Sequence, residues 1–79
     1  MRQGVIEHVG KLVDAAAARY HRDRNARAAL ATFDTALAAL RSLPAGPGSR
    51  TDLARRRVME TCTEYRAQVL AGRELAPDG

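Results

Sequence analysis

Apolar residues recur at steps of three and four in the first quarter of the chain. This is the period of an amphipathic helix, and it predicts a helix over residues 5–20. Charged residues such as Glu7, Lys11 and Asp14 fall between the apolar positions. The predicted apolar face comprises Val5, Ile6, Val9, Leu12, Val13, Ala16, Ala17 and Tyr20.

A polar break over residues 21–25 separates this segment from a second helical pattern over residues 26–43. Asp23 or Asn25 in the break is a suitable N-cap, because its side chain can accept a hydrogen bond from the first turn of a helix. The face of the second helix is marked by Leu30, Phe33, Leu37 and Leu40, flanked by Ala29 and Ala36.

Proline and glycine in residues 44–48 end the second pattern, and a third helix is predicted over residues 51–71. Ser49 followed by Asp52, or Thr51 alone, is its predicted cap. Gly72 is a plausible C-cap, so we expect residues 72–79 to form a frayed, disordered tail. The face of the third helix comprises Ala54, Val58, Cys62, Tyr65 and Val69.

Three helices of similar length with short connections predict an all-α, antiparallel up-down-up bundle. Residues 1–79 suffice for one domain, and the 4% aromatic content argues against a sheet protein. Sixteen alanines make the core thin, so we expect a stability of only a few kcal/mol. The residues expected to be largely buried are Leu12, Ala16, Leu30, Phe33, Leu37, Val58, Cys62 and Tyr65.

The residue inventory argues against an enzyme. His8 and His21 lie too far apart to share one helical face and form a metal site. The single cysteine, Cys62, lies among apolar positions, so we expect it to be a small buried hydrophobe. The sequence contains no glycine-rich phosphate loop and no plausible catalytic triad, so we expect no cofactor and no metal. No apolar run approaches the roughly 20 residues of a membrane span, and we expect a cytoplasmic protein.

The chain carries a net charge of +4, and its one basic run is Arg55, Arg56 and Arg57, with Arg50 nearby. One interpretation is a solvated helix face with weak surface ion pairs. The other is a surface that contacts an anionic partner. Nucleic acid is an unfavoured partner, because no aromatic residues are interleaved with the arginines for base stacking.

A second, weaker apolar stripe on the third helix predicts a peptide-binding groove. Met59, Thr63, Arg66 and Leu70 form this stripe, and we expect it to face small residues of the second helix. An amphipathic peptide helix could lie between them, with Arg66 at the rim. The alternative is that both stripes only widen the core. The remaining groove residues are Thr32, Ala36 and Ala39 on the second helix and Cys62 at the floor.

Residues 20–37 resemble the passage from the first to the second helix of an MIT (microtubule interacting and trafficking) domain. The matching features are an Ala-Leu step at residues 29–30, an aromatic at Phe33 and a second Ala-Leu step at residues 36–37. Tyr65 is similar to a tyrosine near the middle of that family's third helix. The same stretch fits one tetratricopeptide repeat, but about three repeats of 34 residues are needed for a stable array.

The resemblance implies a three-helix, non-catalytic adaptor that binds short C-terminal motifs of ESCRT-III-like proteins. Such domains recruit an attached activity, for example an AAA ATPase, to its substrate. An alternative, favoured by the +4 charge, is direct contact with microtubules or another acidic polymer surface. A third hypothesis is a structural helical-bundle subunit without a peptide groove.

Overall fold

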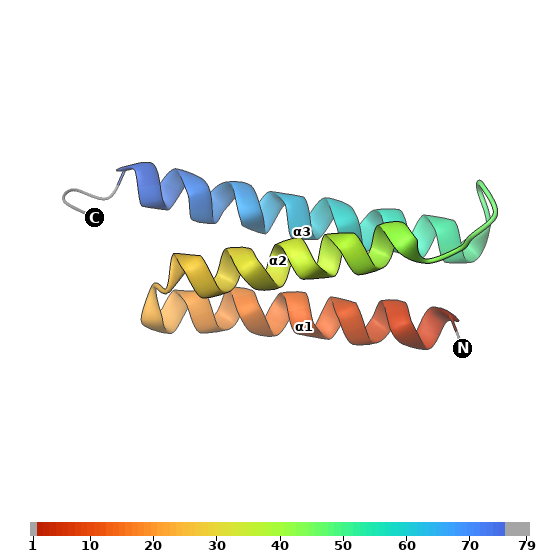
Figure 1. Ribbon diagram of the computed structural model, residues 1–79, viewed down its shortest axis with the longest axis horizontal. Coiled ribbons are helices and arrows are strands. Elements are labelled where there is room, and N and C mark those ends of the chain that lie inside the picture. Colours follow the sequence, from red (N-terminus) through yellow and green to blue (C-terminus); the bar gives the residue numbers. More distant parts are fainter. Residues whose placement is uncertain (1, 76–79) are drawn as a thin grey trace.

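The computed structural model describes residues 2–75, and the side chains of residues 4–72, as three α-helices. They are α1 (Arg2–Asp23), α2 (Ala26–Ser42) and α3 (Arg50–Leu75). The helices run antiparallel, and α2 lies beside both of its neighbours (Figure 1). Each helix packs on the other two to give a rod of 46 × 18 × 15 Å. The predicted all-α up-down-up three-helix bundle is confirmed.

A two-residue turn joins α1 to α2. Arg24 adopts a positive φ of 55°, which reverses the chain within this short break. Asn25 is the N-cap of α2, because its side-chain oxygen accepts a hydrogen bond from the backbone N–H of Ala28 at 3.1 Å. Asp23 in turn accepts one from the backbone N–H of Asn25 at 2.9 Å. Of the two predicted caps, Asn25 is therefore confirmed.

The connection between α2 and α3 is held by two side chains at the start of α3. The hydroxyl of Ser49 accepts a hydrogen bond from the backbone N–H of Asp52 at 3.1 Å, as the sequence predicted for a cap. The Asp52 carboxylate reaches back and accepts one from the backbone N–H of Gly48 at 3.0 Å. Gly48 has φ +76°, a conformation that suits glycine.

Two helices are longer than the sequence predicted. α1 starts at Arg2 and continues to Asp23, and α3 continues to Leu75, so the predicted end at residue 71 is wrong. Gly72 is not a C-cap: it lies inside α3, where a Cβ would stand 3.4 Å from the hydroxyl of Tyr20 on α1. Residues 76–79 of the predicted tail lie outside the described residues.

The core contains Phe33, Leu37 and Cys62, as predicted, but not Leu12, whose exposed fraction is 46%. Val13, the next residue, is 1% exposed. The face of α1 that packs in the core is therefore centred on Val13, and Leu12 lies at the edge of this face. Ala16, Leu30, Val58 and Tyr65 are half-buried rather than buried. The buried apolar residues are Ile6, Val9, Val13, Ala29, Phe33, Ala36, Leu37, Leu40, Cys62 and Val69.

Candidate protein-interaction site

The α2 residues of the predicted groove lie on the side of α1. Thr32, Ala36 and Ala39 line a depression together with Val9 and Leu12 of α1. Ala36 is itself buried in the core, whereas Ala39 is exposed. The expectation that Thr32 and Ala39 face α3 is therefore wrong. Their spacing marks one flank of α2, but the sequence does not determine which neighbour packs there.

The α3 residues of the predicted groove lie elsewhere. Met59 and Thr63 line an open depression with Arg56, Glu60 and Glu64, all on α3. Leu70 is half-buried near the other end of the helix. The structure thus divides the eight predicted groove residues between an α1/α2 surface, the core and an α3 surface.

Arg66 was expected to lie free at the groove rim, but it bridges α2 and α3. Its Nε donates a hydrogen bond to Oδ1 of Asp34 at 2.8 Å, and both side chains remain substantially exposed. An exposed ion pair of this kind contributes at most about 1 kcal/mol. The pair holds the guanidinium against α2.

Cys62 lies in the core and not at the floor of an open groove. Its exposed fraction is 0%, and its Sγ donates a hydrogen bond to the backbone carbonyl of Phe33 at 3.4 Å. Burial raises the pKa of the Cys62 thiol, and the nearby carboxylate of Asp34 adds to this effect. A protonated, buried thiol is a poor nucleophile, so the predicted role as a small hydrophobe fits its environment.

The basic run at the start of α3 is organised around Asp52. This carboxylate is 1% exposed and forms ion pairs with Arg55 and, at 3.3 Å, with Nε of Arg56. The hydrogen bond from the backbone N–H of Gly48 is the main cause that lowers the pKa of Asp52 below 3.8, and the two guanidinium groups lower it further against the effect of burial. Asp52 is therefore an ionised anchor beneath two of the predicted anion-contacting arginines.

Arg55 has a structural role in addition to its charge. Its Nη1 donates a hydrogen bond to the backbone carbonyl of Leu43 at 3.0 Å, which links the first turns of α3 to the end of α2. Arg50 and Arg57 are exposed on the same part of α3. The four predicted arginines thus differ: Arg55 is held at the helix junction, while Arg56 is 66% exposed at its side chain.

Arg41 of α2 completes a basic depression that the sequence analysis missed. Arg41, Arg55, Arg56 and Met59 line one shallow hollow at the end of the bundle that carries the α2–α3 connection. Asp52 pairs with Arg55 and Arg56 but not with Arg41, and no carboxylate lines this depression, so positive charge predominates in it. The sequence did contain a signal for this contact. Arg41 lies in the last turn of α2, and in an antiparallel helix pair the end of one helix lies beside the start of the next.

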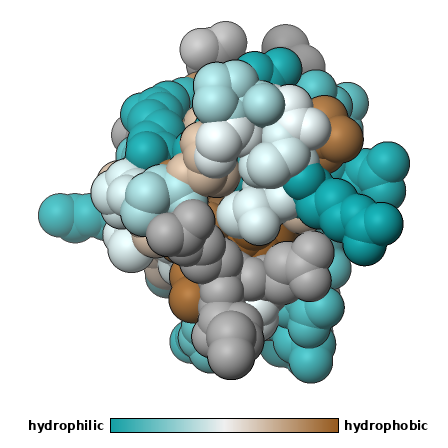
Figure 2. All heavy atoms as spheres, turned by 90° about the vertical axis from the view of Figure 1, so that its right-hand side faces the viewer, coloured by the Kyte–Doolittle hydropathy of each residue, from teal (hydrophilic) through white to brown (hydrophobic). Residues whose placement is uncertain are grey.

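The depression continues along α3 with a change of charge. Arg56 and Met59 also line the neighbouring depression, whose other members include Glu60 and Glu64. A view onto the end of the molecule shows hydrophilic side chains around its outline, with paler and a few hydrophobic ones nearer the centre (Figure 2). The depression lined by Arg41, Arg55, Arg56 and Met59 is called the basic hollow below. Thr63 and the two glutamates continue this surface along α3.

The described residues contain neither a cluster of metal-ligand side chains nor a helix that could cross a membrane. Among them, no three His, Cys, Asp or Glu side chains gather in a way that could hold a metal ion. No helix within residues 2–75 offers a stretch long and apolar enough to cross a bilayer. Comparison of the chain with protein families, curated proteins and solved structures finds no match.

Proposed function

We propose that this chain is a non-catalytic protein-interaction module that binds a short acidic helical motif in the basic hollow. The observation that carries the proposal is the convergence of Arg41, from α2, with Arg55 and Arg56, from α3, around the apolar side chain of Met59. Guanidinium groups beside an apolar contact suit a peptide that presents a carboxylate next to a hydrophobic residue.

Pre-organisation supports a binding role for this hollow. Asp52 and the carbonyl of Leu43 hold Arg55 in place, and Asp52 also restrains Arg56. A partner therefore meets donors that have already lost part of their conformational freedom, which lowers the entropic cost of binding. Arg41 adds a guanidinium with an exposed side chain from the opposite helix.

The charge pattern along α3 also supports a preferred direction for the bound motif. The surface of α3 is positive at Arg56 and negative at Glu60 and Glu64, and Met59 lies between Arg56 and Glu60. A motif that is acidic at one end, apolar in the middle and basic at the other complements this order.

The resemblance to MIT domains gives the proposal its partner class. On that basis the motif is a C-terminal segment of an ESCRT-III-like protein, and the module recruits an attached activity such as an AAA ATPase. A site of this size supports micromolar affinity, about −6 to −8 kcal/mol. The second candidate function is contact with an acidic polymer surface such as a microtubule, which the +4 net charge favours.

Calorimetric titration separates these candidates. The module is titrated with ESCRT-III-type C-terminal peptides, with a version in which the acidic residues are replaced by amides, and with microtubules. The proposal expects micromolar binding of the acidic peptide only, weakened as salt rises because exposed charges are screened beyond about 8–10 Å at 0.1–0.15 M. Equal binding of both peptides contradicts a carboxylate-reading hollow, and binding to microtubules alone favours the second candidate.

A further inference from the structure

The basic hollow joins charged side chains from two helices. Arg41 reaches it from the last turn of α2, and Arg55 and Arg56 reach it from near the start of α3. Met59 is the apolar side chain among the residues that line it. An anion in the hollow therefore meets guanidinium groups from both helices and no carboxylate of the lining.

Much of the hydrogen-bonding capacity of these arginines is not used within the described part of the chain. A guanidinium group carries five N–H donors. Arg55 donates from Nη1 to the carbonyl of Leu43 and from Nη2 to Asp52, and Arg56 pairs with Asp52 through Nε. Arg41 takes part in none of the ion pairs among the described side chains. With respect to these residues, the Nη groups of Arg56 and the guanidinium of Arg41 are thus open to a ligand.

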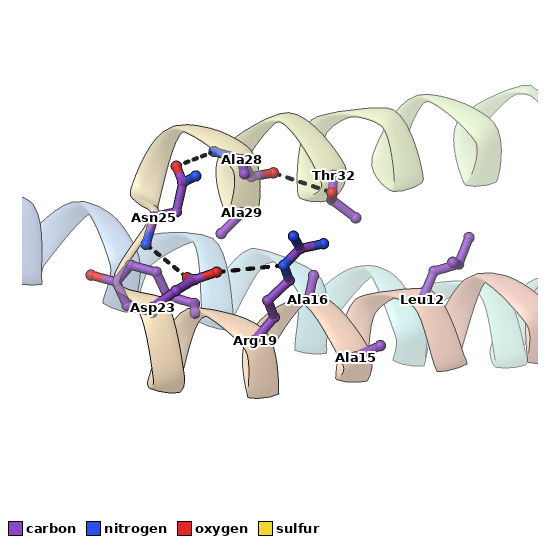
Figure 3. A pocket seen from close by; sticks show the side chains of 10 residues that line it. Leu12, Ala15, Ala16, Arg19, Asp23, Asn25, Ala28, Ala29 and Thr32 are labelled. Carbon is purple, nitrogen blue, oxygen red and sulfur yellow. Dashed lines mark hydrogen bonds and ion pairs between the residues drawn. The ribbon is translucent and has the colours of Figure 1, made fainter.

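A second depression, at the opposite end of the bundle, shows the arrangement that the basic hollow lacks. Arg19 of α1 lines it together with Asp23, and its Nε lies 3.4 Å from Oδ2 of that carboxylate. Asp23 also accepts a hydrogen bond from the backbone N–H of Asn25 at 2.9 Å, and Figure 3 shows these three groups joined in this way. Charge in that depression is balanced by its own lining, so an anion gains little there.

The guanidinium donors of the basic hollow suit a phosphoryl group better than a carboxylate. A phosphoryl group offers three acceptor oxygens and a charge of about −1.5 to −2 at pH 7. A carboxylate offers two oxygens and a single charge. Arginine–phosphate pairs are frequently bidentate, and they are stronger than hydrogen bonds between neutral groups. Three guanidinium groups around one hollow can therefore each contact a different oxygen of a single phosphoryl group.

We propose that the acidic group which this module reads in its partner is a phosphoserine, so that phosphorylation of the motif promotes binding. The inference rests on the proposed function, because it names the partner chemistry of the same hollow. The phosphate oxygens accept hydrogen bonds from Arg41 of α2 and from Arg55 and Arg56 of α3. Asp52 is buried beneath two of these arginines and does not line the hollow, so it does not meet the phosphate directly.

Met59 determines where the partner needs an apolar residue. It follows Arg55 by four positions and Arg56 by three, so it lies next to both on one side of α3. A partner helix laid along α3 then presents a leucine three or four positions from its phosphoserine. Glu60 and Glu64 continue this surface beyond Met59, and they repel a second acidic group there. The expected motif is therefore one phosphoserine beside one apolar residue at helical spacing.

Calorimetric titration of the 79-residue chain with four peptides tests the proposal. The peptides share the leucine and differ only at the acidic site, which is phosphoserine, one glutamate, two adjacent glutamates or serine. We expect the phosphoserine peptide to bind about tenfold more tightly than the two-glutamate peptide, because equal charge does not reproduce the oxygens of one phosphoryl group. Inorganic phosphate alone should bind much more weakly, since it lacks the contact with Met59.

Three variants separate recognition in the hollow from net charge. Arg41→Gln should remove most of the preference for phosphoserine, whereas Arg19→Gln removes the same charge in the depression of Figure 3 and should preserve it. Arg41→Lys keeps the charge but not the guanidinium fork, and it should weaken the phosphoserine peptide several-fold. Arg55 is left unchanged because it fastens α3 to α2. Circular dichroism establishes that each variant retains its helices.

The outcomes distinguish failure of this inference from failure of the proposed function. Equal affinities of the phosphoserine and two-glutamate peptides overturn the inference and leave the acidic-motif function in place. Failure of all four peptides to bind, or equal binding of the serine peptide, overturns both. Equal affinity of inorganic phosphate, or preferential binding to phosphatidylcholine vesicles containing phosphatidylserine, overturns a phosphopeptide partner. Equal effects of Arg41→Gln and Arg19→Gln overturn the assignment to the basic hollow.

Discussion

Asp52 and Arg55 form an ion pair that fastens the start of α3 to the end of α2. The Asp52 carboxylate is buried, and Arg55 extends the link through its hydrogen bond to the carbonyl of Leu43. Removal of Arg55 takes one of two guanidinium partners from a buried carboxylate, which is a costly change at such a pair. This junction also positions two of the three arginines of the basic hollow.

The junction makes stability depend on acid pH. The pKa of Asp52 is lowered in the folded chain, so its ionised form stabilises the fold above its ordinary value of 3.8. That contribution is lost as pH falls from 3.8 through the lower pKa of the folded state. Thermal unfolding measured from pH 6 to pH 2 should show a steeper loss below pH 4 for the native chain than for Asp52→Asn. Parallel pH curves for the two proteins would disprove the role of this carboxylate.

The same junction predicts an order of severity for two substitutions. Ser49→Ala removes one N-cap hydrogen bond and should cost about 1 kcal/mol. Asp52→Ala removes the bond to Gly48 and both arginine pairs, and it should lower the free energy of unfolding by more than Ser49→Ala does. Urea titrations of the two variants make the comparison, and a larger effect of Ser49→Ala would contradict it.

Phe33 is the central core residue of α2. It is 0% exposed, and its ring lies 6.1 Å from that of Tyr65, centroid to centroid. Phe33→Ala should cost about 3–5 kcal/mol, which is enough to unfold so small a domain. Leu53→Ala is the control, with an expected effect within about 0.5 kcal/mol. Circular dichroism at increasing temperature distinguishes them, and an unchanged melting curve for Phe33→Ala would show that the core is misassigned.

Cys62 should react slowly with thiol reagents while the chain is folded. Its thiol is buried, its pKa is raised and it donates to the carbonyl of Phe33. The expected labelling rate is at least tenfold lower in buffer than in urea, because only the thiolate reacts and it must reach solvent. Equal rates in the two conditions would mean that Cys62 is accessible in the native state.

The helical periodicity predicted the three helices and the buried Phe33, because apolar spacing reports directly which face of a helix is covered. It did not separate Val13 from its neighbour Leu12, since both lie within the width of one apolar face. It also assigned Thr32 and Ala39 to the wrong neighbour. A helix in a three-helix bundle has two flanks, and only the three-dimensional packing decides which partner takes each.

The basic hollow depends on a contact between helices that sequence spacing does not reveal. Arg41 and Arg55 are separated by fourteen positions, and the α2–α3 connection brings them to one depression. The sequence of the basic run also did not predict that the buried carboxylate of Asp52 forms ion pairs with Arg55 and Arg56. The sequence placed Asp52 in the predicted cap of the third helix, but its burial depends on the fold of the connection.

The central claim is tested most directly by peptide binding to Arg41→Gln and to its matched control, Arg27→Gln. Both residues are exposed arginines of α2, so both variants change the net charge equally, but only Arg41 lines the basic hollow. With an acidic ESCRT-III-type peptide, amide NMR titration should show shifts at Arg41, Arg56 and Met59. Arg41→Gln should weaken binding about tenfold, or 1.4 kcal/mol, with little effect from Arg27→Gln. Equal affinities for the two variants, or shifts confined to α1, would contradict the account.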